Sequence, residues 1–473
     1  MSFLDNLRAI VGDTHVWAGA DAAPYLTDWR ERYSGRAQAV VGPGSTDEVA
    51  AVVRLCAAAG VPIVPQGGNT GLCGGATPDD SGRAIVLSLR RMNRIRAVDP
   101  RNDSMDVEAG CALQAVQEAA REAGRLFPLS LGSEGSCTIG GNLATNAGGT
   151  QVLRYGTMRE LALGLEVVTA SGDIWRGLRG LRKDNTGYDL RDLFIGSEGT
   201  LGIITAATLK LYPRPAATCT ALVALTSIDA AVALLSLARR GFGASLTAFE
   251  LMAGDCLAAV VRTFPEQRLP FDAGAATLPW HVLLELSDSE SEAHARDRLE
   301  TVLGEAVASD GVRDVAIASS VAQSRALWHL RESIPLAEKA AGKAVKHDIS
   351  IPVSHMADFV RDTNEALQQA FPGVRHVIFG HLGDGNLHYN VAPGAGWSEA
   401  SLLARQDAIF ELVHTHVSRA GGSISAEHGV GQLKREALVR FKDPVELAMM
   451  HTLKRALDPH GIMNPGKVLI AHP

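Results

Sequence analysis

Three glycine-rich segments constrain the fold of this chain more than any other feature. The first, PQGGNTGLCGG (65–75), follows a predicted strand and holds five glycines. Because glycine tolerates positive φ, successive backbone N–H groups there can point into one concavity and bind an anion such as a pyrophosphate. Segments 132–149 and 196–205 repeat the pattern. A single loop of this kind can be merely flexible, but three of them predict an extended ligand, and a dinucleotide fits.

The common nucleotide-binding motifs are absent. The sequence contains no G-x-G-x-x-G, which argues against a Rossmann domain, and no G-x-x-x-x-G-K-[ST], which argues against a P-loop ATPase. The net charge of −7 provides no basic footprint, so no nucleic-acid partner is expected. At 473 residues the chain is long enough for two or three domains.

Strands and helices alternate in the first half of the chain. A short strand (39–43) precedes a helix that begins after Ser45, with Glu48 in place for a capping box, and that ends at Gly60. Further strands are predicted at 61–64, 84–89 and 105–110, and a helix at 112–124.

The middle of the chain repeats a strand–helix unit, which predicts an α+β domain with an antiparallel sheet covered by helices. Strand 220–226 runs into helix 227–240, and strand 280–286 runs into helix 291–303. The proline-marked segment 211–218 is the expected boundary. We therefore expect one domain at 1–215, a second at 216–425 and a helical C-terminal segment at 426–473.

Cysteine spacing and hydropathy bear on the compartment. The six cysteines form no C-x-x-C pair, which predicts free thiols in a reducing environment. The N-terminus has no signal-peptide pattern, and no apolar run approaches the length of a membrane span. A cytoplasmic protein without a membrane span is expected.

The segment FGHLGDGNLHYNV (379–391) carries the strongest chemical pattern. Asp384-Gly385 is a preferred pair for a two-residue hairpin turn, and that turn would set His381 directly opposite His388. Opposed residues share one face of the sheet with Cβ atoms about 4.5–5.5 Å apart, so two imidazoles so placed can bind one metal ion. Asn390 would face the same way as His388.

Glu427 and His428 supply a second group of metal-type residues, followed closely by glycines. Two histidines and one carboxylate are a common ligand set for a catalytic metal ion. The plain alternative is that His381 and His388 are packed sheet residues and Glu427 is a surface acid. The same set would also suit a metal-dependent hydrolase, or a binding module with a structural metal.

The three glycine-rich segments, in this order, resemble the vanillyl-alcohol-oxidase type of FAD-binding domain, and within it the FAD-linked oxidases that act on D-2-hydroxy acids. The resemblance runs from Arg36 to Lys467 and implies a flavoprotein oxidoreductase. It implies an FAD-binding domain, then a ferredoxin-like-repeat domain that binds substrate and metal, then a C-terminal segment that packs back on the FAD domain. No His lies within 65–75, so FAD is expected to be non-covalent. The expected cofactor-binding residues are Pro65, Gly67, Gly68, Asn69, Thr70, Gly71, Ser133, Thr138, Gly140, Gly141, Asn142, Glu198, Gly199, Ile203 and Asn464.

The resemblance also assigns chemical roles. His381, His388 and Glu427 are implied as metal ligands, with zinc expected first and manganese or cobalt as alternatives, and His428 as the base. A hydroxy acid chelated by the metal would lose its hydroxyl proton to His428 and its C2 hydrogen, as hydride, to the flavin.

Arg331 and Lys346 bear on which acid is oxidised. Arg331 presents a planar fork suited to a carboxylate, and the string K-H-D-I-S-I-P-V (346–353) resembles the D-2-hydroxyglutarate dehydrogenases. In that subgroup the residues matching Arg331 and Lys346 help to bind the acid group that distinguishes 2-hydroxyglutarate from lactate, and Asn390 and His428 complete the expected substrate contacts. Pro335 stands where the subgroup carries Thr, so D-malate and D-lactate stay open. The family implies an electron-transfer flavoprotein or a quinone as electron acceptor, and a homodimer.

Overall fold

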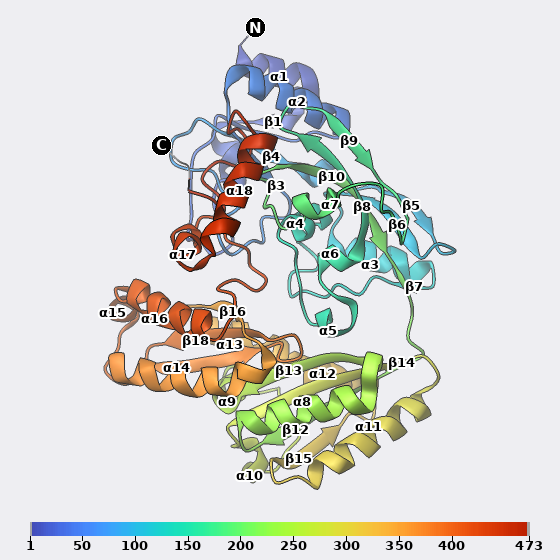
Figure 1. Ribbon diagram of the computed structural model, residues 1–473, viewed down its shortest axis with the longest axis vertical. Coiled ribbons are helices and arrows are strands. Elements are labelled where there is room, and N and C mark those ends of the chain that lie inside the picture. Colours follow the sequence, from blue (N-terminus) through green and yellow to red (C-terminus); the bar gives the residue numbers. More distant parts are fainter. Residues whose placement is uncertain (1, 471–473) are drawn as a thin grey trace. The chain divides into compact units, whose positions relative to one another are not determined.

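The computed structural model describes residues 2–470 and divides into two compact units (Figure 1). The first unit comprises Met1–Gly148, Gly156–Arg214 and Glu427–Pro473, and the second comprises Gly149–Tyr155 and Pro215–Ala426. No helix of the described residues is long and apolar enough to cross a membrane. None of the six cysteines, all of which are described, forms a disulfide.

The first unit begins with a four-stranded sheet of order β1-β2-β4-β3, in which β2, β4 and β3 are parallel. Helix α2 (Thr46–Ala59) crosses between β2 and β3, as predicted, with Ser45 as its N-cap and Gly60 in a left-handed C-cap at φ 62°. The predicted capping box is only half formed, because the Glu48 carboxylate accepts a hydrogen bond from Gly44 N–H instead of from Ser45. The strands are β1 (Val16–Trp17), β2 (Ala39–Val41), β3 (Ile63–Gln66) and β4 (Ile85–Ser88), and α1 (Phe3–Val11) precedes them.

A five-stranded antiparallel sheet of order β5-β6-β10-β8-β9 completes the framework of the first unit. Helix α4 (Ile139–Ala144), which lies within the second glycine-rich segment, packs on strands β6 and β10 of this sheet. The remaining elements here are β5 (Ile95–Asp99), β6 (Ser104–Glu108), α3 (Leu113–Glu122), β7 (Arg125–Leu126), α6 (Met158–Leu161), β8 (Ala162–Thr169), β9 (Ile174–Gly177), α7 (Arg191–Phe194), β10 (Gly202–Lys210) and β11 (Tyr212–Pro213).

The C-terminal segment is helical, with α17 (Arg435–Phe441) and α18 (Pro444–Leu457), and its end returns to strand β3. Met463 bridges Ile63 in the parallel sense, and the backbone of Ile63 exchanges hydrogen bonds with Ile462 and Asn464. Asp458 holds this return in place, because its carboxylate accepts from the Ile462 and Met463 N–H groups and from Lys454.

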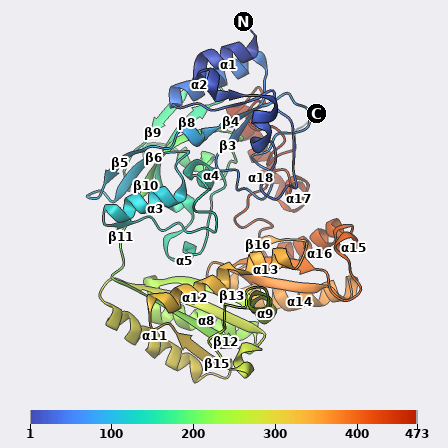
Figure 2. The same ribbon diagram turned by 180° about the vertical axis from the view of Figure 1, so that it is seen from behind.

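The second unit is built on a seven-stranded antiparallel sheet of order β15-β12-β14-β13-β17-β18-β16. The predicted strand–helix units are present: β12 runs into α8, and β14 runs into α11 (Figure 1; Figure 2 shows the other side). The predicted antiparallel sheet covered by helices is therefore confirmed for this part of the chain. The strands are β12 (Ala217–Leu225), β13 (Leu246–Ala253), β14 (Trp280–Asp288), β15 (Val312–Ile317), β16 (Asp348–Ser350), β17 (Arg375–Gly380) and β18 (Asn386–Ala392).

Helices cover both faces of this sheet. Val223 and Leu284 point into the larger core, whereas their neighbours Leu222 and Leu283 point into the smaller one, as strand alternation requires. By the same alternation, Glu250 of β13 faces the smaller core. The larger core is closed by α8 (Ile228–Phe242), α11 (Glu292–Val307), α14 (Met356–Ala370) and α16 (Gln406–Arg419), and the smaller by α9 (Gly254–Thr263), α12 (Val321–Glu332) and α13 (Ile334–Ala340).

Residues 149–155 belong to the second unit, which the predicted boundary at 215 did not anticipate. Helix α5 (Val152–Tyr155) lies against β13. Leu153 packs on the larger core, and the Arg154 guanidinium donates to the Ser287 carbonyl at 2.8 Å. A short excursion of seven residues has too little sequence pattern to reveal such a partner.

We predict that Asp458→Ala lowers the free energy of unfolding by about 2 to 4 kcal/mol, because the partly buried Lys454 ammonium loses its charge partner and two backbone N–H groups lose their acceptor. Asp443→Ala is the control on the same helix. Asp443 is an N-cap, whose removal costs about 1 kcal/mol. Urea denaturation followed by circular dichroism measures both, and equal losses would contradict the role given to Asp458.

Candidate functional site

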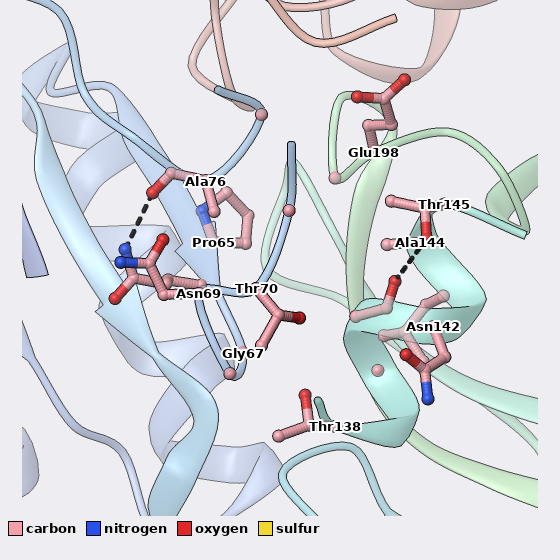
Figure 3. Close-up of a pocket in the computed structure, with 18 of the residues that line it drawn as sticks. Pro65, Gly67, Asn69, Thr70, Ala76, Thr138, Asn142, Ala144, Thr145 and Glu198 are labelled. Carbon is pink, nitrogen blue, oxygen red and sulfur yellow. Dashed lines mark hydrogen bonds between the residues drawn. The ribbon is translucent and has the colours of Figure 1, made fainter. Parts of the chain in front are cut away.

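The three glycine-rich segments converge on one cleft within the first unit (Figure 3). The space within it, counted together with the open mouth, is about 940 Å³. Figure 3 shows the loop with Gly67 and Thr70 across from helix α4, which carries Asn142, with Thr138 below them. The lining residues include Pro65, Gln66, Gly67, Gly68, Asn69, Thr70, Gly71, Thr138, Gly140, Gly141, Asn142, Ser197, Glu198, Gly199, Ile203 and His428.

The cleft has the backbone features of a dinucleotide cradle. A Cβ on Gly68 would lie 2.0 Å from the Ser136 carbonyl oxygen, and one on Gly67 would lie 2.3 Å from Thr138 Oγ1, so only glycine fits at these positions. Asn69 adopts a left-handed backbone at φ 57°, a strained geometry that is common at ligand sites. The buried Thr138 hydroxyl has no hydrogen-bond partner among the described residues. A phosphate-bearing ligand would supply one.

Most of the predicted cofactor residues line this cleft, but two do not. Asn464 lies outside the lining, where its amide donates to the carbonyls of Gly75 and Glu198 and so ties two wall loops together. Ser133 is also outside, and its carbonyl accepts the N–H groups of Ser136 and Cys137 to form a turn. The sequence prediction missed several lining residues next to the glycine loops: Gln66, Leu72, Cys73, Leu89, Ala144, Thr145, Ser197, Gly202 and Ile204.

Glu198 connects the cleft to the segment that carries His428. Its buried carboxylate accepts the N–H groups of Val430 at 2.7 Å and Gly431 at 2.9 Å. Burial raises the pKa of Glu198 above its ordinary value, although these N–H groups and two lysines oppose that rise. With Val430 and Gly431 bound in this way, His428 lies on the wall of the cleft.

The metal-type histidines of the second unit lie close together, but not through the predicted two-residue hairpin. Phe379, not His381, pairs with His388, and residues 381–385 form a longer connection between β17 and β18. The loop is wider because Gly383 N–H bonds to the Phe249 carbonyl of β13 and the Gly385 carbonyl accepts from Ile351 N–H.

The register is displaced by two residues, which preserves the side-chain face, whereas a shift of one would have reversed it. The His381 and His388 rings therefore still meet, with centroids 5.7 Å apart and one ligand-type nitrogen of each within 4.8 Å of the other. Asp348 of β16 is paired opposite His388, and a carboxylate oxygen lies within 4.8 Å of that imidazole. The sequence prediction did not name Asp348 as a candidate ligand.

Two buried carboxylates organise the cationic residues of this face. Glu250 accepts from His381 Nδ1 at 2.7 Å and from Arg331 Nε at 2.8 Å. Burial opposes ionisation of Glu250, but His381 and Arg331 outweigh it and lower the pKa of the carboxyl below its ordinary value. Glu338 accepts from Lys346 Nζ at 2.5 Å.

Asn390 is held at both ends of its amide. Its Nδ2 donates to Glu338 at 2.9 Å, and its Oδ1 accepts the His347 N–H at 3.0 Å. Neither Glu250 nor Glu338 was predicted. The only signal was for Glu250, an isolated acid within the apolar strand TAFELMA (247–253).

Comparison with known families agrees with this geometry. A family described as "FAD binding domain" matches residues 37–177, and one described as "FAD linked oxidases, C-terminal domain" matches residues 214–468. The chain belongs to the FAD-linked oxidases. This FAD-linked oxidase is therefore an FAD-dependent oxidoreductase, and the hydrolase and structural-metal alternatives fall away.

Individual relatives of this FAD-linked oxidase cover nearly its whole length. A D-2-hydroxyglutarate dehydrogenase of Xanthomonas citri pv. viticola is 41% identical over 96% of this chain and 93% of its own. A putative mitochondrial D-lactate dehydrogenase of Schizosaccharomyces pombe is 36% identical over 95% of this chain and 85% of its own. The crystal structure of p-cresol methylhydroxylase with substrate bound shares the fold, with a TM-score of 0.78 at 19% identity over 98% of this chain and 96% of that one.

We predict that Gly68→Ala loses most of its FAD, because the new methyl group would collide with the Ser136 carbonyl and push the loop out of place. Flavin absorbance per mole of purified protein measures the loss. Gly132→Ala is the control, since a Cβ there meets nothing within 4 Å. A Gly68→Ala protein as yellow as the wild type would contradict the assignment of this loop to the cofactor.

Proposed function

We propose that this FAD-linked oxidase oxidises D-2-hydroxyglutarate to 2-oxoglutarate, using non-covalent FAD and a divalent metal ion. The observation that carries the proposal is the grouping of His381, His388, Arg331 and Lys346 around two buried carboxylates in the second unit. Two imidazoles suit a metal ion, and two cations suit the two carboxylates of the substrate. The Xanthomonas relative, by its name, acts on this acid.

The proposed metal ligands are His381, His388 and Glu427. His381 donates through Nδ1 to Glu250, so the lone pair for a metal is on Nε2. Glu427 directly follows Ala426, whose N–H bonds to the carbonyl of Asp348, the residue paired with His388. When bound, the metal lowers the pKa of the substrate hydroxyl and FAD accepts hydride. Zinc suits this ligand set best, with manganese or cobalt as alternatives.

His428 is the proposed base. Its place on the wall of the FAD cleft supports a role beside the flavin. An imidazole can accept the hydroxyl proton of the substrate at neutral pH. Glu198 holds the neighbouring backbone, so the ring is presented from a constrained loop.

Arg331 and Lys346 are proposed to bind the two carboxylates. The Arg331 Nε–H already donates to Glu250. The two terminal nitrogens of the Arg331 guanidinium would therefore receive the C1 carboxylate. Lys346, bound by Glu338, would receive the distal carboxylate. Asn390 positions Glu338, and its direct contact with substrate stays a prediction.

Anaerobic bleaching of the flavin tests the proposal. D-2-hydroxyglutarate is expected to bleach it rapidly, the reaction is expected to stop after chelator treatment, and added zinc should restore it. D-malate and D-lactate are the comparison substrates. Bleaching by D-lactate alone would contradict the substrate, and bleaching that survives removal of the metal would contradict the metal.

D-lactate is the second candidate, because Glu338 already balances the charge of Lys346 and because the Schizosaccharomyces pombe relative is named for that acid. We predict that Lys346→Met raises the KM for D-2-hydroxyglutarate about 10- to 100-fold, as expected for loss of a charged hydrogen bond, and leaves D-lactate unaffected. Lys343→Met, at an exposed lysine nearby, is the control. Equal effects on both substrates would remove Lys346 from the distal subsite.

The remaining proposals concern partners. An electron-transfer flavoprotein or a quinone is proposed as the electron acceptor, and a homodimer as the assembly. The cytoplasmic location stays a prediction, and the Schizosaccharomyces pombe relative is named as mitochondrial.

A further inference from the structure

We infer that Glu250 is a positioning residue that couples the metal-binding imidazole of His381 to Arg331, the anchor for the substrate's C1 carboxylate. The inference rests on the proposed function. It assigns a role to a residue that contacts neither substrate nor metal and that acts on both through its two neighbours.

The geometry of Glu250 is that of a fixed bridge. The residue is fully buried in strand β13, and each carboxylate oxygen serves one partner: Oε1 accepts from His381 Nδ1 at 2.7 Å, and Oε2 accepts from Arg331 Nε at 2.8 Å. Rotation of the carboxylate toward one partner would break its bond to the other. The two partners are therefore held in a fixed relation to one another and to the strand.

The bond to His381 determines which nitrogen can bind a metal. An imidazole that donates its Nδ1 proton to a carboxylate carries its lone pair on Nε2, and the carboxylate makes that nitrogen more basic. The ring is also prevented from turning about its Cβ–Cγ bond. Glu250 thus supports both the orientation and the strength of the proposed ligand.

The bond to Arg331 directs the guanidinium. Its Nε–H is taken by Glu250, and the guanidinium carbon lies over the Phe379 ring, 5.0 Å from the ring centroid. Phe379 is paired opposite His388 and touches its ring, with centroids 4.9 Å apart. The remaining edge of Arg331 therefore points in one direction only, as a carboxylate anchor requires.

Glu285 provides a matched control. It is a buried glutamate on the neighbouring strand β14, and it faces the same core as Glu250. Its carboxylate accepts from Trp328 Nε1 at 2.8 Å and Thr220 Oγ1 at 3.2 Å. A loss caused merely by disturbing a buried acid in this sheet should therefore also occur at Glu285.

The experiment compares Glu250→Gln and Glu285→Gln in the full-length FAD-loaded protein. Zinc affinity is measured by competition with a coloured chelator in the absence of substrate, and kcat and KM are measured for D-2-hydroxyglutarate and D-lactate. Glu250→Gln is expected to weaken zinc binding about 10- to 100-fold and to raise KM for both acids, because both share the C1 carboxylate. FAD content should not change, and Glu285→Gln should resemble the wild type in every readout.

Wild-type zinc affinity and KM in Glu250→Gln would overturn the inference, as would equal losses in the two variants. A rise in KM with unchanged zinc affinity would also overturn it, because Glu250 would then serve Arg331 alone. If no hydroxy acid bleaches the wild-type flavin, the proposed function fails, but the zinc comparison still decides whether Glu250 supports His381.

Discussion

The arrangement of His381 and Arg331 in the second unit depends on one buried carboxylate, Glu250. A charge inside a protein is tolerated only when it is paired and hydrogen-bonded, and Glu250 meets that requirement with an imidazole and a guanidinium. In doing so it brings residues from a hairpin connection and from the end of helix α12 to the centre of the sheet. His381 and Arg331 are thus held together by the need to neutralise Glu250.

In the first unit the buried carboxylate of Glu198 also holds a loop in place, but its partners are backbone N–H groups. Backbone N–H groups of the C-terminal segment donate to the Glu198 carboxylate, but burial outweighs their effect and raises the pKa of Glu198. In Glu250, by contrast, two cationic partners lower the pKa. Both carboxylates hold loops that carry candidate catalytic groups. Closely packed glycines and a left-handed Asn69 line the candidate FAD cleft beside Glu198.

Local patterns predicted much of this architecture. Strand β2 and helix α2 begin and end close to the predicted residues, because hydrophobic periodicity, an N-cap and a C-cap glycine act over a few residues. The side-chain face shared by His381 and His388 was also predictable, since alternation survives a register shift of two. The hairpin register was not predictable, because it is decided by the bonds of Gly383 and Gly385 to Phe249 and Ile351, which are distant in sequence.

The sequence by itself determined the FAD-type glycine loops, the strand–helix units of the second unit and the residues with the chemistry for a metal site. Only the tertiary structure decided which charges neutralise one another. Glu250 lies 81 residues from Arg331 and 131 from His381, and no local rule links positions so far apart. Such pairs form because a charge that is buried without a partner costs a large free energy. That cost arises only once the sheet and its helices have packed together and buried these residues.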